Sequence, residues 1–223
     1  IFDGVDIAPG TDGWVYQYDE EGNSTRIHWN VADPIFQVYP QYDNIYVYEW
    51  TPYANLTIYI DSTLIKTAQT NNDGHVYISL NSFDLAPGQE VMITDGVLTR
   101  THVVTSVQVT EVNPTDDLVK GIAQPGTEST VYGCLDDDCE YEYPVADGAG
   151  NWTASFSTLD VVSGVYGWAI QYDEQGNHTC FYWHVPDPYM TVYPQSDSVY
   201  GYDWTPNTTV KLLINGVVIA TDT

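Results

Sequence analysis

The sequence has very few basic residues. Only 5 of its 223 residues are Lys or Arg, against 31 Asp or Glu, which gives a formal net charge of −26. A nucleic-acid partner is disfavoured because Lys and Arg are needed to displace the counterions of a phosphate backbone. An anionic membrane surface is excluded in the same way. The charge suits an acidic, self-repelling surface outside the cell or in high salt, or a surface that collects cations.

Helical patterns and long apolar runs are also missing. No window of a dozen residues has an apolar period of about 3.6, and no run of about 18 apolar residues is present to span a bilayer. The first residues lack the charged and apolar regions of a signal peptide. Strand-forming residues are abundant, with 19 Tyr and 7 Trp, and they are punctuated by 17 Gly and 12 Pro. We therefore expect an all-β protein with no membrane insertion in this segment.

The chain repeats itself with a constant offset. Residues 13–67 return almost residue for residue as residues 167–221, a difference of 154, and both copies share the stretches QYDE, VYPQ and WTP. A weaker period lies inside this unit, because related turns occur at residues 6–10, 84–88 and 160–164. The 154-residue unit is therefore expected to contain two related domains of alternating type.

Turn signals about every 8 to 12 residues predict about seven short strands per domain, which is typical of a sandwich of two antiparallel sheets. Ala32-Asp33-Pro34 and Pro186-Asp187-Pro188 mark one kind of boundary. We expect whole domains at residues 34–104 and 105–187. Residues 1–33 then form the C-terminal half of a domain of the second type, and residues 188–223 the N-terminal half of the first type. Further repeats of the same polypeptide, or strands from neighbouring subunits, are expected to complete these halves.

The sequence resembles tandem bacterial immunoglobulin-like (Big-type) repeats in four features. These are the turn D-x-x-P/S-G, the N/D-G-N-W type of hairpin, the late Gly-Trp strand and the minimal linkers. Such repeats are strung together in large secreted surface proteins and adhesins. The resemblance implies β-sandwich domains, an extended rod and a mechanical or adhesive role. The chain departs from the pattern in its partial end domains, in lacking a recognisable anchor, and in having more aromatic residues than a plain spacer requires.

Catalytic patterns are poor, and an enzyme is not expected. No Ser or Cys lies in a nucleophile motif such as G-x-S-x-G. No histidine belongs to the repeated design, because His178 and His184 correspond to Ser24 and Asn30 in the other copy. Carboxylates are so numerous that pairs arise by chance in turns. The five histidines are His28, His75, His102, His178 and His184.

The one cofactor that the acidic sequence suggests is calcium, which prefers hard oxygen ligands. The weak candidates are Asp136, Asp137, Asp138 and Glu140, or Asp33 and Asp187 at the domain junctions. The spacing lacks the D-x-[DN]-x-[DN]-G pattern of a calcium loop, and a solvated acidic loop explains the same residues.

The three cysteines and the asparagines bear on the compartment. Cys134 and Cys139 are spaced as a cross-strand pair in a hairpin, so we expect a disulfide between them. Cys180 is left over, either unpaired or in an intermolecular bridge.

If any asparagine carries a glycan, we expect Asn23 and Asn177 to carry one, because both copies keep that sequon at one exposed turn. All five sequon asparagines are Asn23, Asn55, Asn151, Asn177 and Asn207.

Aromatic residues recur on two strands of each copy. Alternation predicts that Trp29 and Trp183 point into a core. A second aromatic face is a candidate for stacking on sugar rings or for packing against another subunit if it is exposed, and burial between the sheets would remove this interpretation. This face comprises Tyr46, Tyr48 and Trp50, with Tyr200, Tyr202 and Trp204 in the second copy.

Together these patterns predict a secreted or cell-surface repeat protein that builds a fibre, stalk or surface layer. Its partners would be other copies or further repeats of itself, with no nucleic acid. The alternative is an adhesin or carbohydrate-binding module that uses the aromatic face, with surface glycans as partners.

Overall fold

The computed structural model describes residues 7–80 and 83–223. These residues form twenty strands and one short 3-10 turn, η1 (Pro40–Tyr42), and they form no α-helix. The prediction of an all-β fold is confirmed. None of these residues makes a helix with the length and apolar character needed to cross a bilayer. Residue 6, at the start of the first of the three related turns, lies outside the described residues.

A seven-stranded sheet runs through the centre of the molecule in the order β13-β12-β15-β16-β3-β4-β7. All its pairings are antiparallel except that of β16 with β3, which is parallel. Its strands are β13 (Asp138–Glu142), β12 (Thr130–Leu135), β15 (Tyr166–Tyr172), β16 (His178–His184), β3 (Ile35–Tyr39), β4 (Asn44–Tyr48) and β7 (Val76–Ser79).

Two smaller sheets supply the opposite layers. The four-stranded sheet has the order β6-β5-β8-β9, and the three-stranded sheet has the order β10-β11-β14. Their strands are β6 (Thr63–Gln69), β5 (Asn55–Ile60), β8 (Glu90–Thr94), β9 (Thr99–Val103), β10 (Gln108–Asn113), β11 (Leu118–Ile122) and β14 (Asn151–Ser155).

Two separate hydrophobic cores follow from this arrangement. The first joins Phe36 and Ile45 of the central sheet to Ile58 and Val91 of the four-stranded sheet, all fully buried. The second core includes Val119 and Trp152 of the three-stranded sheet, together with Val131, Ala169 and Trp183 of the central sheet. We call β3–β9 the first sandwich and β10–β16 the second sandwich. The central sheet belongs to both.

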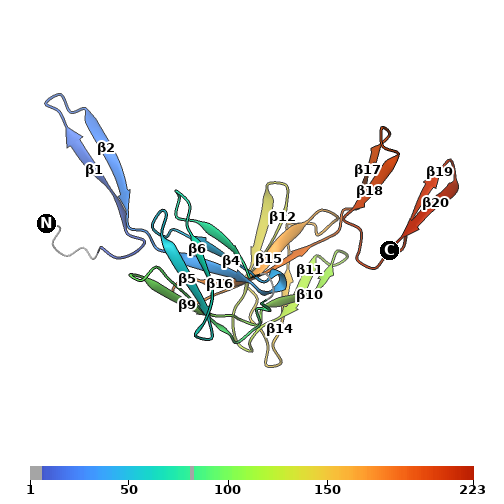
Figure 1. Ribbon diagram of the computed structural model, residues 1–223, viewed down its shortest axis with the longest axis horizontal. Helices are drawn as coiled ribbons and strands as arrows, with labels where there is room; N and C mark the ends of the chain where they lie inside the picture. The colour runs from blue at the N-terminus through green and yellow to red at the C-terminus, as the bar shows by residue number, and fades with distance from the viewer. Residues whose placement is uncertain (1–6, 81–82) are drawn as a thin grey trace.

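Three hairpins project from this body (Figure 1). They are β1 (Asp12–Tyr18) with β2 (Ser24–Asn30), β17 (Tyr189–Tyr193) with β18 (Ser198–Tyr202), and β19 (Val210–Ile214) with β20 (Val217–Asp222). Each hairpin is a two-stranded sheet with largely exposed side chains.

The offset of 154 residues holds in the strand registers. Gly13 lies opposite Trp29 in β1–β2, and Gly167 lies opposite Trp183 in β15–β16. The irregularity after Ile58 in β5 returns at the equivalent place in β19. Left-handed backbone conformations also recur, in the pairs Asp43 and Asp197, Glu49 and Asp203, Tyr53 and Asn207, and Asp61 and Asn215. Local turn chemistry therefore builds the same hairpins twice.

One prediction about the aromatic face is wrong. Strand β4 ends at Tyr48, because Glu49 adopts a left-handed conformation with φ of 57°. This breaks the alternation of side chains, so Trp50 turns into the first core and is only 2% exposed. Tyr46 and Tyr48 lie on the outer face of the sheet, and Trp50 does not join them there.

The two tryptophans predicted to be internal lie over glycines. Trp183 is buried in the second core, as predicted, and its ring covers Gly167. Trp29 covers Gly13 in the same way but is only half-buried, since the hairpin β1–β2 has no sandwich around it. The Gly-Trp pair is thus a packing unit of the hairpin itself.

The substitution Gly167→Ala is expected to destabilise the protein by about 3 kcal/mol or more, because overpacking a rigid core is costly. A Cβ there would lie 1.9 Å from the carbonyl oxygen of Tyr132 and 2.8 Å from the Trp183 ring. Gly148→Ala is the matched control, since a Cβ there meets nothing within 4 Å. Chemical denaturation measures both, and equal stability of the two variants would contradict this packing.

Candidate functional site

The contact between the two sandwiches contains a network of buried, hydrogen-bonded polar side chains. Strand β16 pairs with β3 in parallel, His178 opposite Gln37 and Thr179 opposite Val38. Around this pairing lie η1, the end of β9 and the turn at residues 173–177 that precedes β16. We call this region the joint. It links residues more than one hundred positions apart in the chain.

Asn177 fixes the turn of the second sandwich to the first. Its Oδ1 accepts a hydrogen bond from the backbone N–H of Phe36 at 3.2 Å. Its Nδ2 donates to the carbonyl of Thr101 at 3.3 Å and to Asp173 Oδ2 at 3.1 Å. The side chain is 0% exposed. Every polar atom of this amide is therefore used to hold the joint.

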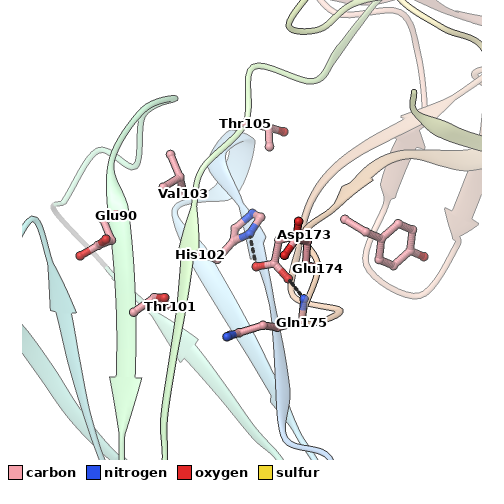
Figure 2. Close-up of a pocket in the computed structure, with 9 residues that line it drawn as sticks. Glu90, Thr101, His102, Val103, Thr105, Asp173, Glu174 and Gln175 are labelled. Carbon is pink, nitrogen blue, oxygen red and sulfur yellow. Dashed lines mark hydrogen bonds and ion pairs between the residues drawn. The ribbon is translucent and has the colours of Figure 1, made fainter. Parts of the chain in front are cut away.

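A chain of hydrogen bonds then crosses the joint. Figure 2 shows one of its contacts, between His102 and Asp173. The backbone N–H of Thr105 donates to Thr179 Oγ1 at 2.9 Å. His102 Nε2 lies 2.9 Å from the same hydroxyl, and His102 Nδ1 lies 2.9 Å from Asp173 Oδ2. These contacts are all satisfied when the imidazole is neutral with its proton on Nδ1, because the hydroxyl then donates to Nε2.

This order of Thr179, His102 and Asp173 resembles the nucleophile, base and acid of a hydrolase. A catalytic hydroxyl must be reachable by a substrate, yet Thr179 is fully buried and its oxygen already accepts the Thr105 N–H. The arrangement therefore serves to connect the sandwiches.

Burial also sets the protonation of the joint histidines. Burial lowers the pKa of His102, and the hydrogen bond and charge of Asp173 offset this only in part. Burial likewise lowers the pKa of His178, whose Nδ1 lies 2.9 Å from the carbonyl oxygen of Gly176 and whose ring packs on Tyr172. Both histidines are consequently held neutral near pH 7.

A pocket of about 340 Å³ opens beside this network. Glu90, Thr101 and Val103 line it from the first sandwich, and Tyr172, Asp173, Glu174 and Gln175 line it from the second. Figure 2 shows that Asp173 and Glu174, on the turn of the second sandwich, lie near His102, whereas Glu90 lies apart from them on the first sandwich.

The other side of the joint combines an amide clamp with an aromatic contact. Gln41 of η1 accepts from the backbone N–H of Tyr182 at 2.6 Å and donates to its carbonyl at 3.4 Å. Tyr39 packs edge-on against Trp168 with ring centroids 5.2 Å apart. Tyr39, Ile170 and Cys180 form a small third core there. Cys180 is free and buried, which raises the pKa of its thiol to about 12.

The expected exposed turn is found in one copy and not in the other. Asn23 is exposed, as predicted. Asn177 was predicted to be exposed as well, but this is wrong because the first sandwich covers it. The remaining sequon asparagines, Asn55, Asn151 and Asn207, are exposed.

The cysteine hairpin lies away from the joint, at the far edge of the central sheet. Cys134 and Cys139 face each other across β12 and β13 and form a disulfide with an S–S distance of 2.01 Å. The three aspartates of the intervening loop are exposed.

Glu140, a weak calcium candidate, has a structural role. Its carboxylate accepts backbone N–H groups of Ser157, Thr158 and Leu159 at 2.7–2.8 Å and both adjacent hydroxyls. Partial burial alone would raise the pKa of Glu140, but these hydrogen bonds lower it to about 2. Its oxygens are therefore fully occupied without an ion.

The junction aspartates are also engaged by protein groups. Asp33 pairs with Arg100 at 2.6 Å. Asp187 accepts from the Ser163 hydroxyl at 3.1 Å, and its backbone N–H donates to Asp203. Across residues 7–80 and 83–223, no three histidine, cysteine or carboxylate side chains come together in a group that could hold a metal ion.

The outer aromatic face forms a second pocket of about 340 Å³. The rings of Tyr46 and Tyr48 are stacked with centroids 5.9 Å apart, and Tyr46 is 4.9 Å from Tyr77. Gln69, Asn71 and His75 line the same pocket. In the second copy Tyr200, Tyr202 and Trp204 are all exposed, with no sandwich around them.

The remaining histidines lie at the surface. His28 contacts Asp12 at 3.1 Å on the first hairpin, and His184 contacts Asp203 at 2.9 Å. The residues of the joint that sequence reasoning missed are Gln41, His102, Asp173 and Thr179. Three of them had a signal, because Gln195, Asp19 and Thr25 stand at the equivalent positions of the other copy.

Comparisons with known proteins give distant likenesses only. No family model matches the chain, and no curated protein matches it. A Ca²⁺-stabilized adhesin with which an Antarctic bacterium binds ice is 12% identical, with a TM-score of 0.27, over 78% of this chain and 55% of that one. A tetra-tandem repeat from the extending region of a large adhesion protein is 15% identical, with a TM-score of 0.29, over 82% of this chain and 58% of that one.

The fibronectin(III)-like modules of CbhA from Clostridium thermocellum are 15% identical, with a TM-score of 0.21, over 67% of this chain and 88% of that one. This chain spans little more than half the length of the two adhesin structures.

Acidification is expected to weaken the joint. In the unfolded chain His102 and His178 have the ordinary pKa of 6.5, whereas in the folded chain the pKa of each is lower. The unfolded state therefore binds more protons below pH 6.5, and stability is full above that pH and falls as the pH drops through the folded-state values.

Melting curves recorded between pH 7.5 and pH 5 measure this loss. The double variant His102→Gln/His178→Gln should lose most of the slope, and His28→Gln, at an exposed position, should keep it. A wild-type melting temperature that stays constant over this range would show that neutral histidines do not matter to the joint.

Proposed function

We propose that this chain is a structural segment of an extracellular fibre, stalk or surface layer and has no enzymatic activity. The observation that carries the proposal is the central sheet, which continues from one core into the next without a flexible linker. A repeat unit that is rigid across its internal boundary transmits orientation and force, as a stalk requires. The recurrence of identical hairpin registers at an offset of 154 residues extends the same design along the chain.

The domain organisation is part of this proposal. We assign residues 34–104 and 105–187 to two domains of different type, with residues 1–33 and 188–223 as halves of the second and the first type. The separate cores of the two sandwiches support the division. The repeated strands support the assignment of the halves, because β1–β2 matches the end of the second sandwich and β17–β20 matches the start of the first.

The extracellular location is supported by chemistry. A disulfide persists in an oxidising compartment, and Cys134 and Cys139 are joined. The net charge of −26 suits a surface that must repel its neighbours and stay hydrated. Among the sequons, Asn55, Asn151 and Asn207 are exposed and open to modification if the organism glycosylates.

Immunogold electron microscopy tests the structural role. Antibodies against residues 34–187 are expected to label filaments or a layer on intact, unpermeabilised cells. The control is the same serum after absorption with the pure protein, which should remove the label. Label confined to the cytosol of sectioned cells would refute the proposal.

A second candidate function is carbohydrate binding at the outer aromatic pocket. Sugar rings stack on aromatic faces, and Tyr46, Tyr48 and Tyr77 offer such faces next to the amides of Gln69 and Asn71. This arrangement favours a glycan ligand for a protein that also serves as an adhesin.

Affinity electrophoresis through gels that contain soluble polysaccharides tests this second function. At least one polysaccharide should retard the wild-type protein, and Tyr46→Ala/Tyr77→Ala should abolish the retardation. Tyr143→Ala removes an exposed tyrosine outside the pocket and should behave as the wild type. Equal retardation of all three proteins would exclude this pocket as the binding site.

A further inference from the structure

Two hairpins that stand apart in this chain are copies of two hairpins that meet. The register of β1–β2 is that of β15–β16, and the register of β17–β18 is that of β3–β4. β15–β16 and β3–β4 are joined by the parallel pairing of β16 with β3. β1–β2 and β17–β18 are separate two-stranded sheets that project from opposite sides of the body in Figure 1. The chain thus carries a second, unpaired copy of each of the two hairpins that meet in the joint.

The aromatic side chains that close the joint are exposed on the free hairpins. Trp14 is 47% exposed and Tyr193 is 44% exposed, whereas Tyr39, the counterpart of Tyr193, is 9% exposed. In the joint, Tyr39 packs on Trp168, the counterpart of Trp14. An isolated two-stranded hairpin is marginally stable in water, so covering these rings would stabilise both hairpins.

The first hairpin also presents the amide that fixes the turn. Asn23 Nδ2 donates to Asp19 Oδ2 at 2.9 Å, as Asn177 does to Asp173 at 3.1 Å. Asn177 Oδ1 accepts the Phe36 N–H, but Asn23 Oδ1 has no partner among residues 7–80 and 83–223. The acceptor is therefore already oriented for a strand like β3.

The amide clamp is preserved on the other hairpin. Gln41 holds both backbone groups of Tyr182, and Gln195 stands at the equivalent position before β18. The clamp contacts backbone only, so it tolerates His28 in place of Tyr182 on β2. The asparagine acceptor and the glutamine clamp are consequently both available between the free hairpins.

One substitution changes the character of this second joint. Arg26 replaces the buried Cys180, and its guanidinium carbon lies 4.8 Å from the ring centroid of Trp14. Arg26 is the only Lys or Arg residue of β1–β2, and β17–β18 has none. In a joint with the geometry of the internal one, Tyr193 would give this cation a second aromatic face.

We propose that hairpin β1–β2 of one copy of this chain binds hairpin β17–β18 of a second copy. Strand β2 pairs in parallel with β17, Ser24 opposite Thr191 and Thr25 opposite Val192, which is the register of His178 with Gln37 and of Thr179 with Val38. The contact is continuous in design with the joint inside the chain. Because the two surfaces differ, the association is head-to-tail and repeats from copy to copy.

The proposal deepens the structural role proposed above and rests on it only for its biological meaning. The second joint lacks counterparts of Thr101, His102 and Thr105, which brace the internal joint from the first sandwich. It is therefore weaker than the internal joint and forms in proportion to protein concentration.

Disulfide trapping tests the register. In the full chain, Ser24→Cys/Thr191→Cys places one new thiol on each hairpin at paired positions. Mild oxidation should give a ladder of dimers, trimers and higher species on a non-reducing gel, and the ladder should grow with concentration. Ser24→Cys/Val192→Cys is the control, because a shift of one residue puts the second thiol on the opposite face of the strand. A ladder that is absent, or equal for the two variants, overturns the proposal.

Sedimentation velocity over a concentration series gives an independent measurement without new thiols. Asn23→Ala should raise the concentration needed for association by roughly fivefold, the effect of losing one hydrogen bond, and Gln195→Ala should raise it by at least as much, because the clamp makes two. Gln124→Ala, an exposed glutamine away from both hairpins, should have no effect. If the wild-type chain remains monomeric at every concentration, the proposed joint between copies is wrong.

The outcomes separate this proposal from the proposed function. If the chain is monomeric in solution but the antibodies label surface filaments, the structural role stands and the joint between copies is rejected. If the chain forms the in-register ladder but the antibodies label only the cytosol, the joint between copies stands and the structural role is rejected.

Discussion

The polar network of the joint decides how the two sandwiches are placed. Asn177, Thr179 and His102 are almost completely removed from water. A buried polar group without a partner costs about 1 to 3 kcal/mol, so any displacement of one sandwich against the other is penalised several times over. Apolar contacts such as that of Tyr39 with Trp168 add area but tolerate sliding. The hydrogen bonds therefore supply the precision of the joint, and the small third core supplies attraction.

Much of the local structure could be predicted from the sequence, because it depends on neighbours along the chain. Turn residues and alternation predict the hairpins, and the repeat of 154 residues predicts that β1–β2 and β15–β16 share a register. The internal position of Trp183 follows from the same alternation. These features need no knowledge of which sheet lies opposite.

The joint could not be predicted in this way. Its decisive contacts link Asn177 to Phe36, which are 141 positions apart, and nothing local to either residue identifies the partner. The same limitation made Asn177 look like an exposed sequon. The prediction that Trp50 belongs to the outer aromatic face was wrong for a different reason. Glu49 adopts a left-handed backbone conformation, which is uncommon for residues other than glycine. A single such residue reverses which face every later side chain takes.

The parallel pairing of β3 with β16 has a mechanical consequence. β3 begins at Ile35, near the start of the two-sandwich body, and β16 ends at His184, near its finish. Tension along the polypeptide therefore pulls β3 toward its N-terminus and β16 toward its C-terminus. Two parallel strands loaded from opposite ends are sheared, so the hydrogen bonds between them, and those of Asn177 and Gln41, bear the load together instead of opening one after another. A body closed in this way resists being drawn out along the direction of that tension.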